Sequence, residues 1–476
     1  MTLLLILVFL GLMLIGVPIA LAMAGASLVF VIVEGVQPHL VVVYRMISGV
    51  DSFPLLAIPF FIMAGSLMNS AGITQRIYDF ALALVGWTRG GLGHVNVLGS
   101  VIFAGMSGTA VADAGGLGNI EIKAMRDHGY DVEFSVGITG ASATIGPIIP
   151  PSLPMVIYGV MANASIGALF AAGFIPGILM ALTLMAMVAY YARVRNFGRD
   201  ARFSWRVFGW ALLEMAAVLG TGALIFVLWS EENKGLSAWL RFGVPVAVAA
   251  ALSFVPRFRA YLPLLTPVIM IGGMMSGLFT PTEAAIAATA YALFLGLAIY
   301  RTVTFKGFIK VSMETVETTV IILLIVGAAS IFGYLITTTQ ITDKVAGLVL
   351  SVTENPILVL LLVNVFLLIV GCFMETIAAI TILVPVLLPL MIKIGVDPVH
   401  FGLIMVLNLM IGLLTPPVGM VLYILARVAN ISFERATRAC GPFLIPLLIT
   451  LAIVTYWGDM VLWVPHLLGF KTSAGP

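Results

Sequence analysis

Two proline-rich interruptions inside long apolar stretches are the parts of this sequence best suited to carry chemistry. The first reads GASATIGPIIPPSLP from Gly140 to Pro154, and the second reads NLMIGLLTPPVGM from Asn408 to Met420. Proline lacks an amide hydrogen and clashes with the preceding helical turn, so neither stretch can be a continuous helix. Inside a membrane the released carbonyls need partners within the protein. Both interruptions are therefore predicted to line something polar: an ion, a substrate or water.

The composition restricts the chain to membrane proteins. Of its 476 residues, 61% are hydrophobic and only 9% are charged, and its mean hydropathy is +1.17. Soluble domains carry roughly 25% charged residues. Apolar runs of about 20 residues or more favour an all-α, polytopic membrane protein embedded in a lipid bilayer.

The N-terminal segment and the minor residue types add few further indications. Residues 3–33 are apolar, and no basic residue precedes Arg45, so we expect a transmembrane helix there rather than a cleaved signal peptide. A net charge of +2 gives no indication of nucleic-acid binding. The two cysteines lack the spacing of a disulfide framework or a metal site.

Several features of the first half of the chain return in the second half in the same order. A glycine, one residue and an aspartate precede each Pro-Pro pair at equal distance, at Gly129–Asp131 and at Gly395–Asp397. A segment interrupted by small residues, Gly105 to Asp113, matches Gly371 to Ala379 and is typical of a re-entrant hairpin. Paired interruptions of this kind indicate the binding site of a secondary transporter. We therefore predict two structural repeats, related by inversion, each with a re-entrant hairpin and a broken helix.

The repeats divide the chain into four parts. The first repeat covers residues 1–192, and the second covers residues 258–465, followed by a C-terminal tail at 466–476. Between them, residues 193–257 hold a basic loop, which the positive-inside rule places in the cytoplasm, and extra apolar helices at 207–230 and 241–256.

The broken helices and hairpins together predict binding of a hard cation such as sodium, and the number of ions stays open. Freed carbonyls and hydroxyls form an uncharged, oxygen-rich environment, and the C-termini of half-helices favour positive charge. The alternative is that the prolines only kink helices for packing. The candidate sodium ligands, many acting through backbone carbonyls, are Gly105, Ser107, Gly146, Ile149, Ser152, Gly371, Thr376, Gly412, Thr415 and Val418.

Three further residues are candidates for contact with the substrate, namely Thr109, Asp113 and Glu375. A carboxylate within an apolar segment costs several kcal/mol unless it is paired or hydrated. Asp113 and Glu375 could equally be structural groups that cap a helix at a hairpin tip. No catalytic residue and no organic cofactor is predicted.

One short motif points to an enzyme. Gly105-Met-Ser107-Gly108 fits the Gly-x-Ser-Gly pattern of rhomboid-like intramembrane serine proteases. That chemistry needs a histidine within reach of the serine, and none of the five histidines lies in the middle of a predicted span. The protease is therefore a distant alternative, as is a passive channel or a purely structural protein.

Four motifs in the right order resemble the large membrane subunit of tripartite ATP-independent periplasmic (TRAP) transporters. They are SGTAVADA from Ser107, IPPS from Ile149, SGLFTPTEAA from Ser276 and GLLTPPVG from Gly412. The resemblance covers about 1–195 and 258–465. It implies sodium-driven import of small organic anions, usually carboxylates, across the bacterial inner membrane, and an elevator-type fold whose hairpins and broken helices move.

The resemblance also implies two protein partners, a small four-helix membrane subunit and a periplasmic substrate-binding protein. The apolar segments at 207–256 depart from the family pattern, in which the basic loop leads more directly to the Thr-Pro-Thr-Glu segment. The main alternative is a stand-alone cation-coupled anion transporter or antiporter of the same superfamily, which needs no binding protein.

Overall fold

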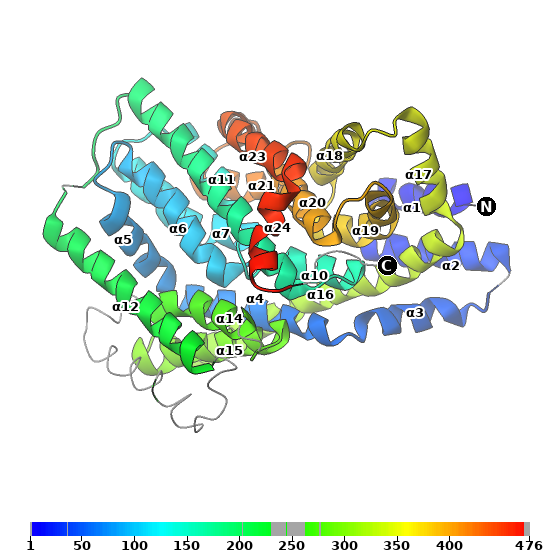
Figure 1. Cartoon of the computed structure of the whole chain (residues 1–476), viewed down its shortest axis with the longest axis horizontal. Helices are drawn as coiled ribbons and strands as arrows, with labels where there is room; N and C mark the ends of the chain where they lie inside the picture. Colours follow the sequence, from blue (N-terminus) through cyan, green and yellow to red (C-terminus); the bar gives the residue numbers. More distant parts are fainter. Residues whose placement is uncertain are drawn as a thin grey trace.

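The computed structural model describes residues 2–35, 37–201, 203–229, 244, 262–275 and 278–470. These residues form helices and no β-strand, which confirms the predicted all-α class. Figure 1 shows α5, α6 and α12 at one end of the molecule and α1, α2 and α17 at the other. The first elements are α1 (Thr2–Leu14), α2 (Ile19–Glu34), α3 (Leu40–Val50), η1 (Phe53–Leu56), α4 (Ala57–Ser70) and α5 (Ile73–Val85).

The prediction of a single helix over residues 3–33 was wrong. The chain leaves the helical conformation after Leu14, and Gly16 adopts a left-handed φ of +89° that favours glycine. Pro18 then immediately precedes α2, a position where its missing amide hydrogen costs no helical hydrogen bond. Helices α1 and α2 pack against each other. Hydropathy alone could not show this turn, because every residue around it except Gly16 and Pro18 is strongly apolar.

The first predicted hairpin and broken helix are both present. The hairpin consists of α6 and the shorter helices α7 and α8, with its tip at Gly108. The first broken helix ends at Ala143 and resumes at Leu153, as the prolines predict. The elements of this part are α6 (Gly91–Ser107), α7 (Ala110–Gly115), α8 (Leu117–Asp127), α9 (Val132–Ala143), α10 (Leu153–Ala162) and α11 (Ile166–Val194).

Between the two halves, α12 (Trp205–Trp229) confirms a helix in the apolar segment at 207–230. The second predicted segment, 241–256, lies outside the described residues apart from position 244. Further along, a capping box begins α15: Glu283 N donates to Thr280 Oγ1 at 3.3 Å, and Thr280 N donates to Glu283 Oε2 at 2.7 Å. The elements here are η5 (Leu262–Leu264), α14 (Leu265–Met275), α15 (Pro281–Phe294) and η6 (Leu295–Ile299).

The second half repeats the arrangement of a helix pair followed by a broken helix. Helices α18 and α19 form the pair, and α20 and α21 are separated by the second proline-rich segment. Each break contains one cis peptide bond, Pro150–Pro151 and Pro416–Pro417. The elements are α16 (Phe305–Thr338), α17 (Ile341–Val352), α18 (Pro356–Phe373), α19 (Thr376–Lys393), α20 (Pro398–Gly412), α21 (Met420–Ala429), α22 (Phe433–Cys440), η7 (Gly441–Phe443), α23 (Leu444–Tyr456) and α24 (Gly458–Leu467).

Within the described residues, seven helical stretches are long and apolar enough to cross a membrane. Both helices of the second hairpin, α18 and α19, are among them, whereas α6 of the first hairpin and the broken-helix segments α10, α20 and α21 are shorter. The seven stretches are Phe53–Ser70, Ile166–Val194, Pro281–Ile299, Phe305–Thr338, Pro356–Phe373, Thr376–Lys393 and Phe433–Tyr456.

The helix that follows each break packs on the other half of the chain. Helix α10 packs on α19 and α20, whereas α21 packs on α7, α8 and α9. Tyr158 of α10 donates a hydrogen bond to the carbonyl of Pro398, 2.6 Å away at the start of α20. This crossed packing makes the two halves one unit. The inverted relation between them stays a prediction.

In each half, a buried polar network joins the first hairpin helix to the broken helix. In the first half, Asn96 of α6 contacts Thr139 and Ser142 of α9 at 2.7 and 2.6 Å. In the second half, Asn408 of α20 donates to Asn364 Oδ1 of α18 at 2.6 Å. Ser142 and Asn408 occupy equivalent positions in the alignment that pairs Pro150 with Pro416. These networks hold each hairpin against its break.

Replacing Asn408 by alanine is expected to lower stability by about 1–2 kcal/mol, because it removes an interhelical hydrogen bond inside the membrane domain. The measurement is thermal unfolding of the purified protein in detergent. Thr318→Val is the control, because the Thr318 hydroxyl bonds only the carbonyl of Glu314 in its own helix. Equal unfolding temperatures for Asn408→Ala and the control would contradict the bracing role.

Candidate functional site

The tip of the first hairpin lies directly on the first break. Gly108 has a left-handed φ of +61°, and its carbonyl accepts a hydrogen bond from Leu153 N at 3.4 Å. A Cβ added at Gly108 would lie 2.7 Å from the carbonyl oxygen of Pro151. A Cβ at Gly146 would lie 3.4 Å from the carbonyl oxygen of Thr109. The structure thus brings the hairpin candidates and the break candidates of the first repeat together.

The backbone of the first break offers acceptors that the protein leaves unused. Residues 145–151 are buried, yet among the described residues none donates a hydrogen bond to the carbonyls from Gly146 to Pro151. The hydroxyl oxygen of Ser107, beside this break, is buried and has no hydrogen-bond partner within the described part of the chain. Buried acceptors are almost always paired, with protein, water or an ion. The first break is therefore well suited to a cation.

The helix ends on either side of this break favour opposite charges. The C-terminus of α9 carries a partial negative charge, and the N-terminus of α10 carries a partial positive charge. Ser152 caps α10, since its hydroxyl accepts a hydrogen bond from Met155 N at 3.2 Å. Ile149 lies within the buried backbone of the break. Gly105 lies against α14, because a Cβ there would come within 2.6 Å of the Pro267 side chain.

The second hairpin and break meet through two glycines. A Cβ added at Gly412 would lie 2.6 Å from the Cα atom of Gly371, so α18 and α20 can cross only where both residues lack side chains. Val418 N donates to the carbonyl of Cys372 at 3.1 Å. Thr376 Oγ1 is buried and has no described partner, like Ser107 Oγ in the first half. The matching unpaired hydroxyls are the strongest structural likeness between the two candidate sites.

The second break is more open than the first. Pro416, Pro417 and Val418 are exposed on the surface of the chain, and no described residue donates a hydrogen bond to the carbonyls of the two prolines. The hydroxyl of Thr415 donates to the carbonyl of Ile411 at 3.0 Å, which leaves its lone pairs free to accept or to bind a cation. The two candidate sites therefore share residue types but differ in how deeply they are buried in the chain.

The three candidate substrate residues have different local roles. Glu375 caps α19, because its Oε2 accepts hydrogen bonds from Ile377 N and Ala378 N at 2.9 and 3.1 Å. Thr109 caps α7 in the same way, through Ala112 N at 3.2 Å. Asp113 caps no helix and is buried, and its Oδ2 has no described partner. The capping interpretation thus fits Glu375 but not Asp113.

Sequence reasoning missed Glu121 in this region. Glu121 is 1% exposed, and neither of its carboxylate oxygens has a hydrogen-bond partner among the described residues. In the sequence Glu121 stands among other charged residues, Lys123, Arg126 and Asp127, and nothing there marks it as buried. Helix α8 is amphipathic, however, and it turns Glu121 inward, toward Gly99 of α6.

The described residues contain no group of three or more histidine, cysteine, aspartate or glutamate side chains that could hold a metal ion. The carbonyl and hydroxyl oxygens at the breaks are ligands of a kind suited to hard ions. The unpaired Ser107 hydroxyl also means that no described histidine activates it as a nucleophile.

Comparison with known proteins identifies the class of the molecule. Residues 6–460 match the family described as "Tripartite ATP-independent periplasmic transporter, DctM component". The chain belongs to this family. It is thus the large permease component of a TRAP transporter, a multi-pass membrane protein and not an enzyme, which removes the protease alternative.

Individual relatives agree over nearly the full length of the TRAP permease. The sialic acid TRAP transporter large permease protein SiaM of Vibrio cholerae is 43% identical over 463 residues, which cover 97% of this chain and 98% of SiaM. The 2,3-diketo-L-gulonate TRAP transporter large permease protein YiaN of Escherichia coli is 35% identical over 464 residues, covering 96% and 98%. Among solved structures, the Alcanivorax borkumensis YdaH transporter shares the fold, with a TM-score of 0.57 at 14% identity over 88% of this chain and 87% of YdaH.

The glycine contact at the second site gives a direct test of the hairpin packing. Gly412→Ala is expected to destabilise the permease by about 1–3 kcal/mol, because the new methyl group overlaps the backbone of Gly371. The measurement is the shift in unfolding temperature in detergent. Gly272→Ala in α14 is the matched control, since a Cβ there would meet nothing within 4 Å. An alanine at 412 that is as well tolerated as one at 272 would contradict the packing.

Proposed function

We propose that this permease imports small organic anions by coupling their movement to sodium, and that it receives them from a binding protein. The observation that carries the proposal is the first break, where buried carbonyls have no hydrogen-bond donor and the Ser107 hydroxyl has no partner among the described residues. The second break repeats the arrangement with Thr376. A neutral cage of oxygen atoms suits a monovalent hard cation, because no carboxylate is needed to balance its charge.

The proposed sodium ligands come from each hairpin tip and the break that it contacts. Gly105, Ser107, Gly146, Ile149 and Ser152 serve the first site. The hydroxyl of Ser152 already accepts one amide hydrogen and keeps a second lone pair for an ion. The ligands of the second site are Gly371, Thr376, Gly412, Thr415 and Val418.

The proposed substrate is an organic acid. The printed names of the relatives include sialic acid, 2,3-diketo-L-gulonate and C4-dicarboxylate transporters, all of which concern acids. We propose Thr109, Asp113 and Glu375 as substrate contacts. The negative charge of Asp113 or Glu375 repels an anionic substrate unless a sodium ion lies beside it. This requirement for sodium would couple the two binding events.

The proposed assembly contains a small four-helix membrane subunit and a periplasmic substrate-binding protein, and it lies in the bacterial inner membrane. We further propose that the hairpins and broken helices move together as the mobile part of an elevator. Support comes from the crossed packing of α10 on α19 and of α21 on α7, which ties the elements of both sites into one body. Helices α2, α3 and α4, which pack on α16, would form the fixed part.

Sodium coupling is tested by uptake into liposomes that contain the permease and the small subunit. Radiolabelled sialic acid, presented by its binding protein, should accumulate only under an inward sodium gradient. Collapsing the gradient with a sodium ionophore should stop accumulation. Uptake that persists after the collapse would contradict sodium coupling, and uptake without the binding protein would favour a stand-alone transporter.

The two unpaired hydroxyls provide a sharper test of the sites. Ser107→Ala and Thr376→Val should each raise the sodium concentration for half-maximal uptake about tenfold, the effect of losing one charge-assisted contact of roughly 1.4 kcal/mol. Ser135→Ala is the control, because the buried Ser135 hydroxyl bonds the carbonyl of Asp131 and lies outside the break. Unchanged sodium dependence in both variants would remove these hydroxyls from the sites.

A further inference from the structure

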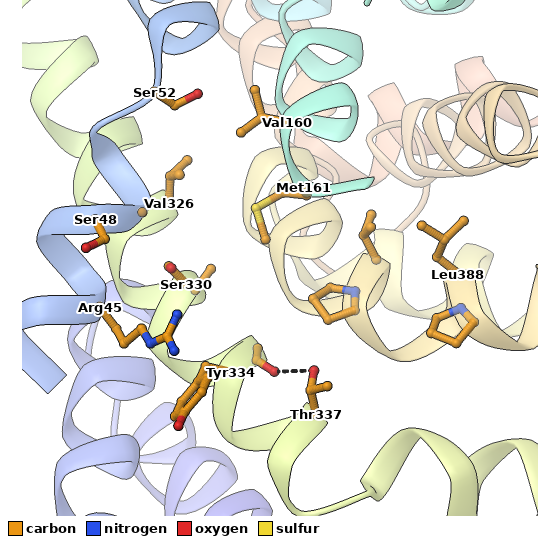
Figure 2. Close-up of a pocket in the computed structure, with 16 residues that line it drawn as sticks. Arg45, Ser48, Ser52, Val160, Met161, Val326, Ser330, Tyr334, Thr337 and Leu388 are labelled. Carbon is orange, nitrogen blue, oxygen red and sulfur yellow. Dashed lines mark hydrogen bonds between the residues drawn. The ribbon is translucent and has the colours of Figure 1, made fainter. Parts of the chain in front are cut away.

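A cavity of about 580 Å³ lies apart from the hairpin tips, between α3 and α16 on one side and α10 and α19 on the other. Figure 2 shows Arg45 and Tyr334 on one wall and Met161 and Leu388 facing them. Binding sites for small molecules commonly occupy about 300–1,000 Å³. The cavity is therefore large enough for a small organic acid.

The polar character of the cavity comes from one wall. Arg45 is the one charged side chain among the described residues that line it. The hydroxyls of Ser48, Ser52 and Ser330 lie on the same wall as Arg45, whereas the α10 and α19 side contributes apolar residues and prolines. A single cation beside several hydroxyl groups, with no lining carboxylate, gives a cavity that favours anions.

The guanidinium group of Arg45 is positioned but not neutralised. It stacks over the ring of Tyr334 at 4.0 Å, and it makes no ion pair or hydrogen bond with the described residues. Tyr334 is itself held, because Gln37 Nε2 donates to its hydroxyl at 3.3 Å. Stacking uses the face of the guanidinium and leaves its N–H edge free, which is the edge that binds a carboxylate in a bidentate manner.

The cavity lies at a defined distance from the two candidate ion sites. Val160 lies eight residues after Ser152 on α10, and Val384 lies eight residues after Thr376 on α19. At a rise of 1.5 Å per residue, the part of each helix that lines the cavity lies about 12 Å from the N-terminus of that helix. A small acid held at Arg45 would therefore lie near the proposed substrate residues without reaching them.

We infer that Arg45 is a separate binding station on the α3–α16 side of the cavity, where it holds the carboxylate of an organic acid on its path to or from the hairpin tips. The inference rests on the proposed function for the identity of its ligand, but not on sodium coupling. Tyr334 is a positioning residue, because it orients the guanidinium without itself binding the acid.

The first experiment probes the charge of the cavity without transport. Ser48 lies one helical turn after Arg45 and is exposed, so Ser48→Cys in a Cys372→Ser background places a thiol beside the guanidinium. Cys440 is buried and stays in place. The thiol is labelled in parallel with a sulfonate-bearing and a trimethylammonium-bearing methanethiosulfonate reagent. The ratio of the two labelling rates, sulfonate over trimethylammonium, should be about tenfold higher with Arg45 present than in the Arg45→Gln variant.

Competition then identifies the ligand. Millimolar sialic acid, used as the probe, should slow labelling when Arg45 is present and have no effect after Arg45→Gln. Arg45→Lys should keep the preference for the anionic reagent but lose most of the protection, because lysine cannot form the bidentate contact. Arg76→Gln is the matched control, since Arg76 stacks on Tyr300 at 4.2 Å in the same manner but does not line the cavity.

The second experiment measures uptake in the liposome assay. Arg45→Gln should raise KM for sialic acid about tenfold, the effect of one lost charge-assisted pair, while the sodium dependence stays unchanged. Tyr334→Leu should raise KM less than Arg45→Gln does, and Tyr334→Phe should raise it least, because it keeps the stacking ring and loses only the hydrogen bond from Gln37.

The outcomes separate this inference from the proposed function. Labelling needs no gradient and no binding protein, so loss of sodium coupling would leave the labelling result standing. If the ratio of the two labelling rates is the same in the Arg45→Gln variant and in its parent, Arg45 does not attract anions to the cavity and the inference is wrong. Protection by phosphatidylglycerol vesicles, but not by sialic acid, would also overturn it, because Arg45 would then be a lipid anchor.

Discussion

The structure depends on one constraint, that backbone carbonyls released inside a membrane must still find partners. Two proline-rich segments release such carbonyls, and each lies beneath the tip of a hairpin from its own half of the chain. The hairpins approach closely through their backbones, and no described hairpin group donates a hydrogen bond to the carbonyls of residues 146–151, so these carbonyls keep their capacity to bind. A helix break that the fold left fully satisfied would have no capacity for an ion.

The hairpins can approach the breaks only because particular residues are small. Gly371 and Gly412 touch through their backbones, and Gly108 fits against Pro151 in a left-handed conformation. Buried amide and hydroxyl networks at Asn96 and Asn408 then hold these approaches in place. The similarity of the two sites is incomplete, since the first break is buried within the chain and the second lies partly on its surface.

Charge is distributed in a way that separates a cation from an anion. The breaks offer neutral oxygens, whereas the cavity beside α3 offers the guanidinium of Arg45, which forms no ion pair with the residues that the structure describes. The two regions share α10 and α19: the N-terminus of α10 lies at the first break, the N-terminus of α19 lies at the tip of the second hairpin, and later turns of both helices line the cavity. Any displacement of α10 and α19 would therefore change both regions together. This connection gives a physical basis for coupling an anion to a cation in a permease with few charged residues.

The sequence by itself determined the membrane class, both broken helices, both hairpins and the residue types at the candidate sites, because hydropathy and the steric limits of proline act locally. It did not reveal the turn at Gly16, where hydropathy stays uniform. Only the tertiary structure decided that α10 and α21 pack on opposite halves, that Glu375 caps α19, that Glu121 faces inward and that Arg45 lines a cavity. Those outcomes depend on which helices, far apart in the sequence, come into contact. The pattern of residues along one helix does not show which surface of another helix will pack against it.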